Sequence, residues 1–169
     1  MPNNVKNKLT IVGDENQVRE ILKAIQNEEA GVGSIDFNKI ISMPKELWDI
    51  TVGSESCKAL EFYSLYAKYE NQKDSEICER LINDYGADDK MMNFGKQLFK
   101  NLQKHRAADW YDWSRRNWGT KWSAYHNSGH SGGNEITFET AWSRPEPVIK
   151  QLSKMFPDLS ILLRSFALI

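Results

Sequence analysis

The sequence predicts an α+β protein: a mainly antiparallel sheet with helices on one face and a long helical insertion. Three observations lead to this expectation. Strand patterns occur in the first 41 residues and again after residue 120. Helical periodicity follows the first strand and precedes the last one. Between these regions, residues 45–116 show helical stripes and no alternating pattern, which favours an insertion between elements of one sheet.

The first strand is expected over residues 5–12, because residues 8–12 are β-branched and apolar and end at Gly13. Asp14, followed three residues later by Gln17, is typical of a capping box at a helix start. Helical spacing then predicts a helix over residues 15–29 with one buried face. The apolar residues that carry this spacing are Val18, Ile21, Leu22 and Ile25.

A second, short strand is expected over residues 35–41. Ile35, Phe37 and Ile41 occupy alternating positions there. Pro44 would end it, because proline cannot donate to a strand ladder.

Residues 45–116 are predicted to form helices only, as an insertion within a single domain spanning residues 1–169. Gly86 stands where a glycine commonly follows a helix end. Three apolar stripes with helical spacing support this prediction. They are Phe62, Tyr66 and Tyr69; Ile77, Leu81, Ile82 and Tyr85; and Met91, Phe94, Leu98 and Leu102.

The last part of the chain predicts a hairpin, a helix and a final strand. Residues 121–127 and 135–142 alternate in polarity, and the turn-forming residues between them join the two strands. A capping pattern opens a helix over residues 145–156, and residues 161–167 are apolar enough to need cover on both faces. Without the insertion, this order is the split βαβ arrangement of ferredoxin-like folds.

Composition and charge exclude several classes of protein. With 40% hydrophobic and 11% aromatic residues, the chain can bury a core. No apolar run approaches the length of a membrane span, and Cys57 and Cys78 lack a metal-binding spacing, so we expect a cytoplasmic protein with reduced cysteines. Residues 1–95 carry a net charge of −6, and residues 96–169 carry a net charge of +5. This distribution is too balanced for a committed nucleic-acid binder and not acidic enough for a DNA mimic.

Five of the six tryptophans fall between residues 110 and 142. Trp118 and Trp122 bracket the run Trp-Gly-Thr-Lys-Trp, and Trp142 follows in a second block. Two interpretations stay open. The rings form an exposed platform that stacks bases or anchors a protein, or alternate strand positions bury them under the last helix, with Trp142 and Phe138 on one face.

Basic and aromatic residues also mix along residues 96–122, as single-stranded nucleic-acid binding requires. The alternative is an amphipathic helix with a solvated basic side. The candidate binding residues are Arg115, Arg116, Trp118, Lys121, Trp122, Trp110, Trp113, Lys104 and Arg106.

No set of residues predicts catalysis, and we expect neither a cofactor nor a metal. His126 and His130 do not share a helix face, and a metal there would need Glu135 or Glu139 as a further ligand. We therefore expect a protein that is not an enzyme.

Four segments resemble the YubB ferredoxin-like family of phage- and plasmid-borne proteins, a group without an assigned biochemical activity. They are Met1-Pro-Asn-Asn-Val with Asn7-Lys-Leu-Thr-Ile-Val-Gly13, Asp36-Phe-Asn-Lys-Ile-Ile-Ser-Met-Pro44, Asn117-Trp-Gly-Thr-Lys-Trp122, and Phe138-Glu-Thr-Ala-Trp-Ser-Arg-Pro-Glu-Pro-Val148. The resemblance implies a ferredoxin-like fold and a mobile element in a bacterial host, and it supplies no catalytic residues.

The expected function is that of a non-enzymatic phage or plasmid accessory protein that binds a host macromolecule, either a protein or a ribonucleoprotein complex. Inhibition of a host defence complex, such as an RNA-guided nuclease, is one concrete version. The alternative is an RNA or single-stranded DNA binding protein that uses the basic-aromatic stretch 96–122.

Overall fold

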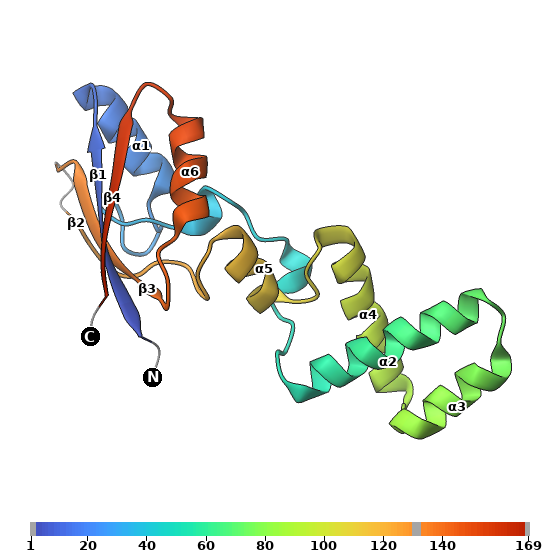
Figure 1. Ribbon diagram of the computed structural model, residues 1–169. Helices are drawn as coiled ribbons and strands as arrows, with labels where there is room; N and C mark the ends of the chain where they lie inside the picture. The colour runs from blue at the N-terminus through green and yellow to red at the C-terminus, as the bar shows by residue number, and fades with distance from the viewer. Residues whose placement is uncertain (1–2, 130–132, 168–169) are drawn as a thin grey trace. The chain divides into compact units, whose positions relative to one another are not determined.

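The computed structural model describes residues 3–129 and 133–167. It contains a four-stranded antiparallel sheet with the strand order β2-β3-β1-β4 (Figure 1). The strands are β1 (Asn4–Val12), β2 (Tyr125–Gly129), β3 (Glu135–Ala141) and β4 (Ser160–Ala167). Helices α1 (Glu15–Ile25) and α6 (Glu146–Met155) lie together on one side of this sheet (Figure 1). The α+β class and the ferredoxin-like arrangement are thereby confirmed.

The sheet buries one face under these two helices. Leu9 and Ile11 of β1, Ile136 and Phe138 of β3, and Leu152 of α6 are almost completely buried. One polar side chain of β1 lies among them. Asn7 donates to Thr140 Oγ1 at 2.9 Å and accepts from Ser165 Oγ at 2.7 Å, so both halves of its amide are satisfied.

Residues 45–116 contain helices and no strand, and all of them are described. The helices are η2 (Lys45–Leu47), α2 (Ser54–Asn71), α3 (Ser75–Tyr85), α4 (Asp89–His105) and α5 (Trp110–Asn117). The chain divides into two compact units, a sheet unit (Met1–Met43 with Ser114–Ile169) and a helical unit (Pro44–Trp113). Phe62, Ala59 and Leu98 centre the core of the helical unit. The single domain spanning residues 1–169 stays a prediction.

The strand expected over residues 35–41 is wrong, because this segment contains the 3-10 helix η1 (Phe37–Lys39). Side chains satisfy its backbone in place of a ladder. Asp36 Oδ1 accepts from the Asn38 amide at 2.9 Å, and the Phe37 amide donates to Ser123 Oγ at 3.2 Å. Such local side-chain bonds compete with strand pairing.

Several predicted boundaries also differ. Helix α1 ends at Ile25 because Gln26 is extended, and residues 121–124 are irregular, so β2 begins only at Tyr125. The last strand was expected to be covered on both faces, and this is wrong. Leu162 and Phe166 of β4 are 54% and 56% exposed on the face opposite α1 and α6.

Candidate binding surface

The segment 118–122 links α5 to the strand region, and its first residues are fixed by packing. Trp118 is 4% exposed, its Nε1 donates to the Ile41 carbonyl at 2.9 Å, and its ring meets Phe37 edge-on at 5.9 Å. Gly119 has φ of +78°, and a Cβ there would lie 2.8 Å from Pro147 Cδ. Only glycine fits this turn without strain.

Hydroxyl groups hold the rest of the segment. Thr120 is buried and donates to the Ala141 carbonyl at 2.8 Å. Ser114 Oγ donates to the Lys121 carbonyl at 2.7 Å, and Ser143 Oγ donates to the Gly119 carbonyl. These three hydrogen bonds fix the backbone that carries Lys121 and Trp122, although no strand pairing is present there.

Two exposed indoles flank one lysine in this region. Trp122 is 40% exposed and Trp142 is 46% exposed. The Nζ atom of Lys121 lies 4.5 Å from the ring centroid of Trp122 and 5.0 Å from that of Trp142. Both distances suit cation–π attraction. We call Lys121, Trp122 and Trp142 the indole–lysine platform.

Trp142 also has an unusual backbone conformation. Its φ is +72°, although its amide still donates to the Asn3 carbonyl at 2.8 Å beyond the end of β3. The left-handed region costs a non-glycine residue about 1–2 kcal/mol. Burial does not explain this strain, because the residue is 46% exposed. Strain of this kind is concentrated at functional sites.

A polar group of side chains adjoins the platform. The Tyr125 ring lies 6.4 Å from that of Trp122, and its hydroxyl donates to Asn4 Oδ1 at 3.0 Å. Burial raises the pKa of Tyr125, and the nearby Glu139 carboxylate adds to this effect. His126 Nδ1 lies 3.1 Å from Glu139 Oε2. Tyr125 therefore stays a neutral hydrogen-bonding phenol at physiological pH.

Of the two histidines considered as metal ligands, the structure describes His126 only. His126 contacts Glu139. Glu135, the other glutamate considered as a ligand, pairs with Lys8 Nζ at 2.9 Å. His130 lies outside the described residues. In residues 3–129 and 133–167, no group of three or more potential ligands lies together.

Of the nine candidate binding residues, the platform includes two, Lys121 and Trp122. Arg115 and Arg116, in the last turn of α5, are exposed and belong to the same sheet unit. Trp118 is in this unit too, but its ring is buried. Trp142 was outside the candidate set. The sequence pointed to it only together with Trp118 and Trp122, as part of an exposed platform or as the last residue of a buried strand face.

The other four candidates belong to the helical unit. Lys104 Nζ lies 2.7 Å from Glu46 Oε1, and Arg106 follows α4 with φ of +56°. Trp113 is 6% exposed, and Trp110 is half-buried. The basic-aromatic stretch is thus divided between two units, and two of its rings are withdrawn from solvent.

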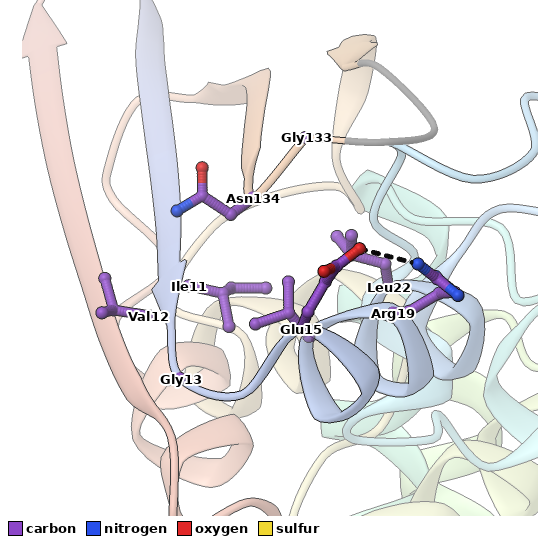
Figure 2. A pocket seen from close by; sticks show the side chains of 9 residues that line it. Ile11, Val12, Gly13, Glu15, Arg19, Leu22, Gly133 and Asn134 are labelled. Atoms are coloured by element: carbon purple, nitrogen blue, oxygen red, sulfur yellow. Dashed lines mark hydrogen bonds and ion pairs between the residues drawn. The ribbon is translucent and has the colours of Figure 1, made fainter.

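A cavity of about 290 Å³ lies between the end of β1 and the start of α1 (Figure 2). Its charged lining residues, Glu15 and Arg19, pair with each other at 2.9 Å (Figure 2). Ile11, Leu22 and Asn134 also line it. This lining has an apolar floor and a self-satisfied ion pair, so it points to no particular ligand.

Comparison with known proteins identifies one related region. A family model described as the ferredoxin-like domain in Api92-like protein matches residues 121–164, about a quarter of the chain. The matched residues run from Lys121 through β2, β3 and α6 into β4, and they include all three residues of the platform. No curated protein and no solved structure matches this chain. In the part of the chain that the structure describes, no helix has the length and apolar character needed to cross a membrane.

Proposed function

We propose that this protein is a non-enzymatic binding module that docks on a host macromolecule through the indole–lysine platform. One observation carries the proposal: Trp142 is held in a strained backbone conformation while the residue remains 46% exposed beside Lys121 and Trp122. Tryptophans account for much of the binding energy in protein interfaces, and rigid placement lowers the cost of binding.

A protein surface is the partner that these contacts favour. The Lys121 ammonium already lies within cation–π distance of both indoles, so a base stacking between the two rings would compete with it. A protein surface can use the outer parts of the rings and place a carboxylate near the ammonium. Such a surface would present an apolar pocket with an acidic rim.

The biological setting in this proposal comes from the family resemblance. The chain would be a YubB-type protein of a phage or plasmid, acting in the cytoplasm of the bacterial host. Its partner would be a host protein or ribonucleoprotein, and a defence complex such as an RNA-guided nuclease is one version. This version rests on association with mobile elements.

Direct binding of RNA or single-stranded DNA is the second candidate. The platform combines a cation with two aromatic rings, which are the elements that single-strand binding uses. Arg115 and Arg116 are exposed in the same unit. Against it, Trp113 and Trp118 are buried and so cannot stack bases.

Affinity capture from host lysate tests the proposal. The wild type, a Trp122→Ala/Trp142→Ala variant and a Trp48→Ala control are compared, each with and without nuclease treatment. Trp48 is 51% exposed but belongs to the helical unit. The proposal expects a nuclease-resistant partner that the double variant loses and the control keeps. Capture abolished by nuclease, with steep salt dependence, would favour the second candidate. Equal capture by all three proteins would refute the platform.

A further inference from the structure

The sheet has an open face, on the side opposite α1 and α6 (Figure 1). Three large apolar side chains on this face alternate with polar and charged residues of β1 and β4. Val12, Leu162 and Phe166 point to this face and are 49%, 54% and 56% exposed. β4 is also an edge strand of the described sheet. Val12 and Leu162 are diagonal neighbours across β1 and β4, and Phe166 follows on β4 beyond Arg164. Large apolar side chains that share one exposed sheet face favour an interaction surface.

Charge divides the same face into two halves. Lys6, Lys8 and Arg164 make the β1–β4 half basic, and Glu135 and Glu139 make the β3 half acidic. Glu135 already pairs with Lys8. Glu139 accepts from Asn4 Nδ2 at 3.0 Å and contacts His126, yet a carboxylate has room for further donors. A face with one basic and one acidic half is complementary to itself.

The register of the strands sharpens this complementarity. Tyr125 of β2 is the Cα partner of Glu139, Glu139 is the partner of Lys6, and Lys6 is the partner of Phe166. One row across the sheet therefore has the order aromatic, acid, base, aromatic. Residues directly opposite each other on neighbouring strands share a face, so this row lies on the open face.

We propose that the open face binds a second copy of this chain, with a two-fold axis parallel to the strands and midway between β3 and β1. This axis places Lys6 of one protomer over the partner's Glu139, and Phe166 over the partner's Tyr125. A two-fold axis perpendicular to the strands would instead stack one basic half on the other. Charge therefore selects one of the two face-to-face arrangements.

The size of the face sets the expected strength. The four strands have 9, 5, 7 and 8 residues. With a rise of about 3.3 Å per residue and strands about 4.8 Å apart, they cover roughly 460 Å² per copy. Two copies together would bury roughly 900 Å², which lies in the range of weak, transient interfaces. We therefore expect a reversible dimer whose population rises with protein concentration. A polyanion fits the face less well, because it would meet the two glutamates.

Sedimentation equilibrium over a wide concentration range tests this inference. The mass should rise with concentration from the monomer value of 19.5 kDa toward twice that value. Leu162→Glu/Phe166→Glu should stay monomeric throughout. Met155→Glu is the matched control, because Met155 is 43% exposed on α6, on the other side of the sheet. This control should associate like the wild type.

A charge exchange tests the proposed axis. Lys6→Glu alone and Glu139→Lys alone should each weaken association at least tenfold, and the combined variant should restore it. Thermal unfolding of each variant separates lost association from lost folding. A wild type that stays at 19.5 kDa at all concentrations overturns the inference. So does a dimer that Leu162→Glu/Phe166→Glu leaves intact, and failure of the exchange to restore association refutes this axis.

Discussion

Replacing Trp142 with glycine and, separately, with alanine tests whether the chain holds this residue in the left-handed conformation. At φ of +72°, alanine is strained by about 1–2 kcal/mol relative to glycine. Glycine loses about 0.5–1 kcal/mol through its greater freedom in the unfolded chain. The Trp142→Gly variant should therefore be more stable than Trp142→Ala by roughly 0.5–1 kcal/mol, the reverse of the usual order in a strand.

Urea unfolding followed by far-UV circular dichroism measures this difference, with equal slopes required for the two variants. Phe138→Ala is the reference variant, because it shows how much free energy of unfolding is lost when a fully buried side chain is truncated. Phe138 is 1% exposed and meets Phe37 edge-on at 5.9 Å, so its loss should cost about 3–5 kcal/mol. Trp142 is 46% exposed, so roughly half of the about 200 Å² that a tryptophan can bury is shielded from solvent. Its replacement by alanine should therefore cost about 2.5 kcal/mol.

Two results would refute this reasoning. If Trp142→Ala proves more stable than Trp142→Gly, the residue does not adopt a left-handed backbone in solution. If Trp142→Ala and Phe138→Ala destabilise equally, the indole is a core residue and the platform does not exist as described.

Three further changes test the supports of the fold and the platform. Gly119→Ala should lower stability by about 1–3 kcal/mol through backbone strain, and an unchanged thermal midpoint would show that the turn is different. Thr120→Val should lose about 1–3 kcal/mol in urea unfolding, because a buried carbonyl loses its donor; a loss near zero would contradict that bond. The hydrogen bond and charge of Lys39 lower the pKa of Glu28 in the folded protein. The pair therefore stabilises the fold fully at pH values above the ordinary pKa of glutamate. This stabilisation is lost as the pH falls through the lowered pKa of Glu28 in the folded protein. Lys39→Met should therefore make the acid-side fall of the thermal midpoint shallower, and an identical fall in both proteins would count against the pair.

Periodicity was enough to predict the sheet and its two helices, because burial of one face fixes the positions of apolar residues. Val18, Ile21 and Leu22 were expected on the buried face of α1 and are buried there. The same rule failed around Phe37. There, Asp36 and Asn38 bind backbone amides and form a 3-10 turn, although the apolar residues alternate as in a strand.

The candidate site could be predicted only in part. Lys121 and Trp122 were recognised from the mixture of charge and aromatic rings. The sequence could not tell which tryptophans are buried, because the chain makes a left-handed turn at Gly119 and stays irregular over residues 121–124, so strand alternation does not apply there. Trp118, before the turn, is buried, and Trp122, after it, is exposed. The strand ends one residue before Trp142, and the alternation pattern does not show that its backbone turns there.

Hydroxyl-radical footprinting of each tryptophan, in the free chain and in the complex isolated from host lysate, shows whether the indole–lysine platform is the binding surface. In the free chain, Trp122 and Trp142 should be oxidised readily, whereas Trp113 and Trp118 should be protected by burial. In the complex, Trp122 and Trp142 should be strongly protected, and Trp48 should be as reactive as before. Unchanged oxidation of Trp122 and Trp142 in the complex would contradict a binding role for the indole–lysine platform.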